Sequence, residues 1–287
     1  FPVIKISYEK LSIAQEDIFS KIYFAGIRFF IASLLVFLAA RLLFRMPLKI
    51  RRDQVKFIVL LGLLQTSLQY FFFYIGIANT SGIKSAILQS GSTFFVVVAA
   101  HFIYRDDKMD MRKVVSLILG FGGIVLINIG KGFDLHFKLL GEGFLIGTAL
   151  VSAFSTFFVK GLSKKINPVI LTGGQMFAGS LFLLAVGKIG MGARMLAFDK
   201  VSLGLLLYAS FLSATAFLLW YTLLKYNRAG ELSIYRLFIP VFGALFSVLF
   251  IEGEVLTGKL LGGLALVVAG MIVLNLKREN GHFEQQP

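Results

Sequence analysis

The chain alternates along its whole length between long apolar stretches and short polar breaks. Each apolar stretch approaches the roughly 20 residues that cross a bilayer as an α-helix. The breaks between them hold Gly, Pro, Asn and charged residues, which end helices and favour loops. The pattern therefore predicts membrane-spanning helices at residues 24–43, 57–79, 84–104, 113–129, 142–160, 169–187, 202–224, 231–251 and 257–276.

The first residues, Phe1 to Ile6, are apolar but too few to cross a membrane. Phe157 to Lys160 resemble them and end a full apolar stretch that begins near Glu142. By this analogy, Phe1 to Ile6 are the end of a first helix that is largely missing here. We therefore expect ten helices in the intact protein, five in each half, with a nine-helix protein as the alternative.

An internal repeat relates the two halves, because residues 79–126 recur at 227–274, 148 positions later and without a gap. The most informative shared spacing is Asn-x-x-Gly-x-x-Ser, which begins at Asn79 and at Asn227. A repeat in so apolar a chain is typical of transporters built from two halves. We expect a first repeat over residues 1–130, a second over 141–277, and a cytoplasmic tail at 278–287.

The composition indicates that most of the chain is surrounded by lipid. Hydrophobic residues make up 57%, the mean hydropathy is +0.83 and only 15% of residues are charged, against about 25% in soluble domains. Cysteine is absent and the three His are far apart in sequence, so no metal site and no cofactor are expected. The net charge of +14 does not indicate nucleic-acid binding, because the basic residues follow a membrane topology instead.

Lys and Arg divide unequally between the two sets of alternating loops. One set holds nine and comprises residues 8–23, 80–84, 130–141, 188–201 and 252–259. The other set holds 17 and comprises residues 41–56, 105–113, 160–168, 225–230 and 277–287. By the positive-inside rule, the second set of loops lies in the cytoplasm. Both termini of the intact protein are then cytoplasmic, and the expected location is the inner membrane of the cell. With five helices in each half, an odd number, the second half enters the membrane from the opposite side, so the repeats are inverted. Transporters that work by alternating access have this symmetry.

Carboxylates are absent from the predicted membrane midplane, since all fifteen lie in loops or near helix ends. Proton-driven carriers usually need a titratable group at depth. His101 lies within a turn of a helix end and is interpreted as interfacial. The sequence leaves proton coupling, exchange and uniport open.

Arg236 is the most informative polar residue, because it lies one to two turns inside the predicted helix 231–251 with no carboxylate three or four residues away. A charge at a helix centre costs about 2.5–3.5 kcal/mol on insertion scales. Its side chain either reaches the cytoplasmic headgroups or faces a cavity and binds a substrate carboxylate or phosphate. Pro240, four residues later, removes a backbone donor and is expected to bend the helix at a gate.

Other polar side chains are predicted to line the same cavity, with helix packing or an interfacial position as the alternative for several of them. They are Gln65, Gln69, Tyr70, Tyr74, Gln89, Ser92, Ser155, Trp220 and Tyr235. Arg28 lies nearer the outer end of its helix, where its side chain would reach the headgroups.

The whole chain resembles the EamA-type carriers of the drug/metabolite transporter superfamily. The resemblance is carried by Ala-Gly-x-x-Ser from Ala229, by Ile-Pro-Val-Phe-Gly-Ala-Leu-Phe-Ser from Ile239, and by Trp-Tyr-Thr-Leu-Leu-Lys-Tyr from Trp220. It implies an all-α membrane bundle of ten helices in two repeats, and a carrier of amino acids, other small metabolites or drugs, often outward. Ser92 stands where the family pattern would place a first-half Pro, so symmetrical gating does not follow.

We therefore expect a non-enzymatic secondary transporter of small metabolites that works by alternating access in the lipid bilayer. A channel, a lipid scramblase and a membrane scaffold without transport are the alternatives. The sequence does not name the substrate, and it leaves the oligomeric state open, a homodimer included.

Overall fold

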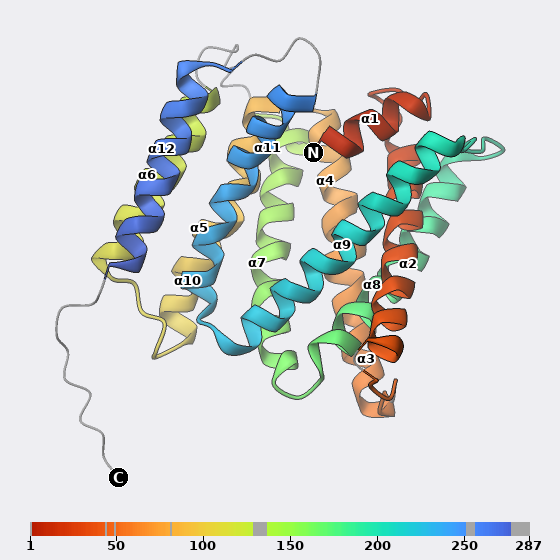
Figure 1. Ribbon diagram of the computed structural model, residues 1–287, viewed down its shortest axis with the longest axis horizontal. Helices are drawn as coiled ribbons and strands as arrows, with labels where there is room; N and C mark the ends of the chain where they lie inside the picture. The colour runs from red at the N-terminus through yellow and green to blue at the C-terminus, as the bar shows by residue number, and fades with distance from the viewer. Residues whose placement is uncertain are drawn as a thin grey trace.

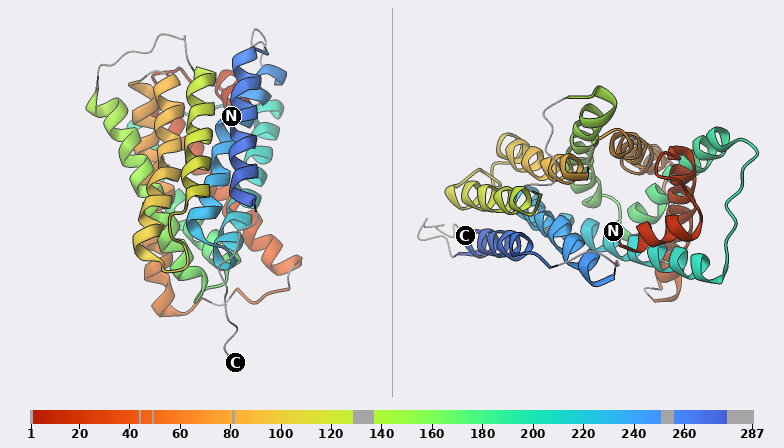
Figure 2. Two further views of the ribbon diagram at one scale, coloured as in Figure 1. Left: turned by 90° about the vertical axis from the view of Figure 1, so that its left-hand side faces the viewer. Right: turned by 90° about the horizontal axis from the view of Figure 1, so that it is seen from above.

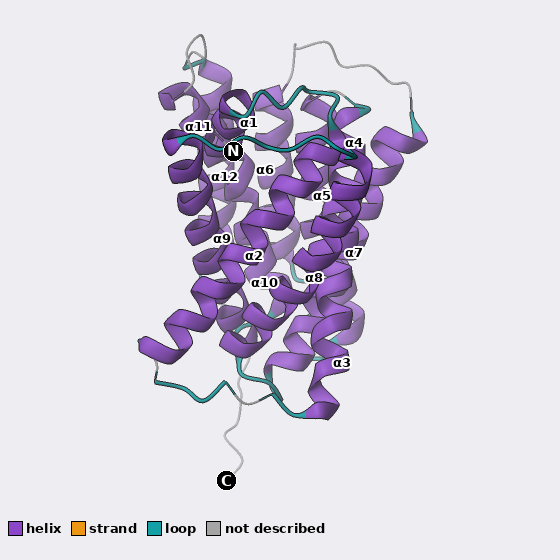
Figure 3. Ribbon diagram, turned by 90° about the vertical axis from the view of Figure 1, so that its right-hand side faces the viewer, coloured by secondary structure: helices purple, strands orange, loops and turns teal. Residues whose placement is uncertain are grey.

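The computed structural model describes residues 2–43, 45–48, 50–80, 82–128, 137–250 and 256–276. All regular structure in these ranges is helical, which confirms the predicted all-α class (Figure 3). The first half contains α1 (Pro2–Lys10), α2 (Ile18–Leu42), α3 (Arg52–Leu61), η1 (Gly62–Leu68), α4 (Gln69–Ala78), α5 (Gly82–Ile103) and α6 (Met111–Asn128). The second half contains η2 (Leu139–Gly143), α7 (Phe144–Ser163), α8 (Pro168–Met191), α9 (Lys200–Tyr226), α10 (Ala229–Ile234), η3 (Tyr235–Leu237), α11 (Phe238–Phe250) and α12 (Gly258–Asn275).

Nine helical segments of the described chain are long and apolar enough to cross a membrane. Each one overlaps one of the nine predicted stretches, so the prediction of the spans is confirmed. Several segments extend beyond the prediction by a turn or more, as in Ile18–Leu42 and Pro168–Met191. A polar cap accounts for the earlier start of α2, because the Asp17 side chain accepts the Ser20 backbone N–H at its first turn. The predicted tail at 278–287 lies outside the described residues.

The helices run between two faces of the bundle (Figure 1). The upper face carries the connections that follow α1, α4 and α8, and the lower face carries those that follow α2, α5, α7 and α9. The view from above shows α6 and α12 paired at one end of the molecule and α2, α8 and α9 grouped at the other (Figure 2). Helices from both halves of the chain are therefore interleaved.

Glycine allows the closest helix contacts. A Cβ on Gly179 of α8 would lie 2.5 Å from the Gly62 carbonyl oxygen at the start of η1. In the α6–α12 pair, a Cβ on Gly263 would lie 2.7 Å from the Gly123 carbonyl oxygen. Small residues thus bring the backbones together, as is common where lipid removes the hydrophobic drive between helices.

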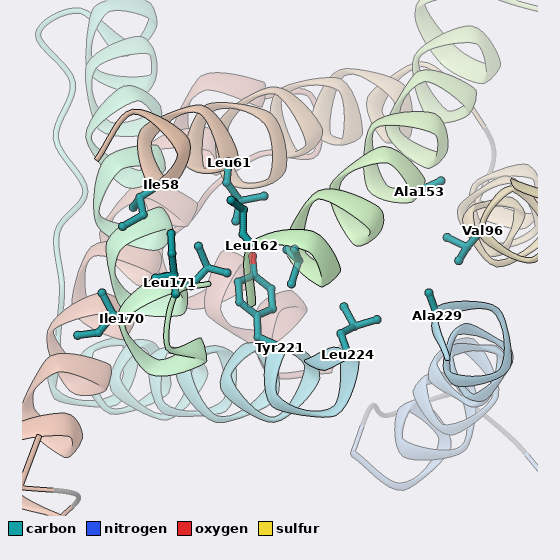
Figure 4. Packing of buried hydrophobic residues seen from close by; sticks show 12 residues of the cluster. Ile58, Leu61, Val96, Ala153, Leu162, Ile170, Leu171, Tyr221, Leu224 and Ala229 are labelled. Carbon is teal, nitrogen blue, oxygen red and sulfur yellow. The ribbon is translucent and has the colours of Figure 1, made fainter. Parts of the chain in front are cut away.

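Near the lower face, apolar side chains from α3, α5, α7, α8, α9 and α10 fill the space between the two halves (Figure 4). Tyr221 of α9 is fully buried there beside Leu61, Leu162 and Leu224. We call this set the lower cluster; it comprises Ile58, Leu61, Val96, Ala153, Val159, Leu162, Ile166, Ile170, Leu171, Tyr221, Leu224 and Ala229. It closes the lower part of the bundle.

Candidate functional site

A cavity of about 870 Å³ lies between α1, α2, α4, α5, α7 and the α10–η3–α11 segment. Its lining includes Ile13 and Gln15, which belong to the upper-face loop before α2. Toward the lower face the helices converge on the lower cluster. The cavity therefore communicates with the upper face and is closed toward the lower one.

Arg236 lines this cavity from η3, a short 3₁₀ turn that interrupts the α-helix between α10 and α11. Both terminal nitrogens donate to the Ser152 hydroxyl of α7 at 3.3 Å. The guanidinium carbon lies 5.4 Å from the ring centroid of Trp220, a cation–π arrangement. No carboxylate of the described residues forms an ion pair with Arg236. Of the two interpretations that the sequence allowed, the structure shows the one in which this residue faces a cavity.

Five further predicted residues line the cavity together with Arg236. Gln69, Tyr70 and Tyr74 contribute from α4, and Gln89 and Ser92 contribute from α5. The Ser92 hydroxyl donates to the Gln89 carbonyl at 3.1 Å. The Gln69 side-chain oxygen is buried and has no hydrogen-bond donor among the described residues, so it is available to a bound solute or to water.

Four other predicted residues are not in the lining, which corrects the sequence interpretation. Tyr235 is 40% exposed on the outside of the bundle, and its hydroxyl donates to the Asn275 side chain at 2.8 Å. Gln65 is buried one turn below Gln69 and accepts the Tyr221 hydroxyl at 2.7 Å. Ser155 is fully buried among packed helices. Trp220 packs against the lower cluster and contacts Arg236 through the cation–π arrangement.

Pro240 lies in the first turn of α11, immediately after η3. Proline is tolerated there because it has no N–H to contribute. The backbone changes from a 3₁₀ turn to an α-helix between Arg236 and Pro240.

The lining also contains Thr148 and Ser152 of α7. These two residues belong to a stripe of small polar side chains that the sequence shows at spacings of three and four along this helix. Arg28 of α2 is only 8% exposed and lines the cavity, so its expected position at the headgroups is wrong. The predicted helix began at residue 24, whereas α2 begins at Ile18, which places Arg28 well inside the helix.

The upper part of the lining is polar and carries several titratable groups. The Tyr8 hydroxyl of α1 donates to the Tyr74 hydroxyl at 3.1 Å. Burial raises the pKa of Tyr8 well above its usual 10.0, and the neighbouring Tyr74 adds to the effect, so Tyr8 stays protonated. The Lys21 ammonium donates to the Gln15 carbonyl at 2.5 Å. Charged lining residues are thus Lys5, Glu9, Lys21, Arg28 and Arg236.

Comparison with known protein families identifies the family of this chain. The model of the EamA-like transporter family matches it twice, over residues 9–129 and 139–276. The chain belongs to the EamA-like transporter family. Together with its apolar helices, this makes it a multi-pass membrane transporter.

Similar proteins carry the same general description. The uncharacterized transporter YvbV of Bacillus subtilis is 29% identical over 262 residues, which cover 88% of this chain and 82% of that protein. An uncharacterized transporter of Archaeoglobus fulgidus is 26% identical over 261 residues, covering 90% of each. A solved crystal structure matches with a TM-score of 0.76 at 17% identity, over 96% of this chain and 95% of that one, which supports the fold.

Proposed function

We propose that this EamA-family protein is a secondary transporter that moves a small organic solute with an anionic group across the cell membrane by alternating access. Amino acids and related carboxylates are the expected substrates. The observation that carries the proposal is Arg236, a cavity-lining cation with no ion-pair partner in the described chain.

An unpaired cation in a membrane cavity is costly, because burial removes water from the charge. A substrate carboxylate would supply the missing counter-charge and accept two parallel N–H donors from the planar guanidinium. Ser152 on one side and Trp220 on the other hold the guanidinium in place. The polar groups of Gln69, Tyr70 and Tyr74 would then orient the rest of the solute.

The conformation fits one state of an alternating-access cycle. The cavity is open toward the upper face and closed below, where the lower cluster packs. The excess of Lys and Arg near the lower face favours a cytoplasmic position for that face, so the cavity would face outward here. Two consecutive family matches of similar length support two repeats, and the change of helix type at η3, ahead of Pro240, is the proposed gate. Export is the direction we favour.

The test is solute flux into proteoliposomes with a panel of amino acids, their decarboxylated amines and their amides. We expect saturable flux for carboxylates, and loss of that flux in Arg236→Ala. Arg41→Ala is the matched control, because Arg41 is exposed at the lower end of α2 and does not line the cavity. Arg236→Lys keeps the charge but loses the planar fork, so it should retain only part of the activity.

Thermal melting of the same variants separates binding from folding. Arg236 contributes one long hydrogen-bond contact and no ion pair, so Arg236→Ala should melt at or above the wild-type temperature. Normal flux in a well-folded Arg236→Ala variant would refute the proposed role. Flux that never saturates would favour the channel or scramblase alternative.

A further inference from the structure

Arg28 is a second cation of the cavity that the proposed role of Arg236 does not use. It lies ten residues after Ile18, the first residue of α2, and therefore about 15 Å below the upper end of that helix. Its side chain is more than nine-tenths buried and lines the same cavity as Arg236. A cation at this depth does not reach the headgroups.

The polar neighbour of the Arg28 guanidinium is the neutral Tyr70 hydroxyl, which does not offset its charge. Its Nε is buried and makes no hydrogen bond, and within the described ranges no carboxylate pairs with it. Its guanidinium carbon lies 4.5 Å from the ring centroid of Phe29 and 5.8 Å from that of Tyr70. Aromatic faces stabilise a cation only partly, so a site for an acceptor remains.

The charges of the lining do not balance. Four cationic side chains, Lys5, Lys21, Arg28 and Arg236, line the cavity against one carboxylate, Glu9. Glu9 belongs to α1 at the upper face, and none of the described ion pairs joins it to either arginine. An occupant with a single negative charge would therefore leave one buried guanidinium without an anion.

The two arginines lie at different heights in the same cavity. Arg236 is 14 residues before Phe250, the last residue of α11, and so about 21 Å below the upper end of that segment. Arg28 comes from α2 and Arg236 from η3, which are separate parts of the bundle (Figure 1). Tyr70 of α4 lines the cavity within electrostatic range of both arginines.

From this arrangement we propose that the cavity takes a small organic dianion, with one anionic group at Arg28 and the other at Arg236. The apolar middle of the molecule would pack against Tyr70 and Phe73, which line the cavity. Arginine forks recognise carboxylate and phosphate alike, so dicarboxylates and phosphorylated carboxylates share the required chemistry. The inference rests on the proposed transport function and names its substrate class.

Binding is measured on the purified full chain by calorimetry, with three sets of probes. These are dicarboxylates of three to six carbons, the same molecules with one carboxylate converted to an amide, and phosphorylated carboxylates of equal length. Wild-type protein should prefer a dianion over its matched monoamide by about ten- to hundredfold, the usual value of one charge-assisted contact. Preference between the first and third sets identifies the anionic group.

Arg28→Gln is the decisive variant, with Arg41→Gln on the same helix as the control. Arg28→Gln should reduce dianion affinity to that of the monoamide and leave monoamide affinity unchanged, while Arg41→Gln binds as the wild type does. Melting temperatures confirm that both variants are folded. Equal wild-type affinity for dianion and monoamide, or an equal loss of both in Arg28→Gln, would overturn the inference.

The outcome also separates this inference from the proposed function. Monoanions could bind and be transported in a way that depends on Arg236 but not on Arg28. That result would refute the dianion as the substrate class and leave the proposed transport function intact. Failure of every anionic probe to bind or to be carried would remove both.

Discussion

Replacing Asp107 with alanine is expected to destabilise the protein strongly, because this carboxylate joins the two halves of the chain at the lower face. Its Oδ1 pairs with the Lys113 ammonium at 2.6 Å, and its Oδ2 accepts the Gly230 backbone N–H at 2.7 Å. The side chains of Lys113 and Asp107 are only 2% and 1% exposed. Gly230 belongs to α10, 123 residues away in the chain.

The magnitude follows from what the substitution leaves behind. Lys113 would keep one acceptor, the Lys108 carbonyl at 2.8 Å, but its charge would be buried without an anion. Breaking one side of a buried pair in this way costs about 3–5 kcal/mol. The Gly230 N–H would also lose its acceptor, which places the expected loss in the upper part of that range.

The assay is the free energy of unfolding in mixed micelles titrated with a denaturing detergent. Asp106→Ala is the control, because Asp106 is the exposed neighbour of Asp107 and should change stability by less than about 0.5 kcal/mol. Adding Lys113→Met to Asp107→Ala should recover part of the loss, since the buried charge is then removed. Equal stability of the Asp107→Ala and Asp106→Ala variants would refute the reasoning.

Two further predictions concern Gln65 and Asp17. Tyr221→Phe removes the only described donor to the buried Gln65 side-chain oxygen and should lower the free energy of unfolding by about 1–3 kcal/mol. Tyr208→Phe, at an exposed position, is the control and should not change stability measurably. Unchanged stability in Tyr221→Phe would contradict the hydrogen bond between Tyr221 and Gln65. Burial raises the pKa of Asp17, but hydrogen bonds from Ser20 and the charge of Arg194 outweigh burial, so the folded pKa lies below the ordinary 3.8. Because the pKa of Asp17 is lower in the folded state than in the unfolded state, its stabilisation is present above about pH 4 and is lost as pH falls through the folded pKa. Asp17→Asn should lose this pH dependence of stability. Identical acid melting curves for the wild type and Asp17→Asn would contradict the prediction.

The hydrophobic pattern was sufficient for the class and the spans, but not for the side of each helix that faces the cavity. Gln65 and Gln69 illustrate the limit, since they lie one turn apart on the same apolar segment. Gln69 lines the cavity, whereas Gln65 pairs with Tyr221 from α9, 156 residues away. Nothing local distinguishes the two residues, because the difference lies in which helix packs against each turn.

Tyr235 and Arg236 show the same limit at adjacent positions. Successive residues of a 3₁₀ turn point about 120° apart, so Arg236 lines the cavity while Tyr235 faces outward to Asn275. Arg28 was misplaced for a related reason. Its distance from the helix end suggested a side chain that reaches the headgroups, but its neighbours Phe29 and Tyr70 keep the guanidinium within the bundle.

The sequence by itself determined that the chain spans a membrane, where its helices lie and which residues repeat. The length and hydropathy of a segment are local properties, and they decide whether that segment is stable as a helix in the bilayer. Only the tertiary structure decided that Arg28 and Arg236 share one cavity, that Gln65 belongs to a packing contact, and that Asp107 joins the two halves. Those facts depend on contacts between segments more than 100 residues apart, which helix packing sets and hydropathy does not encode.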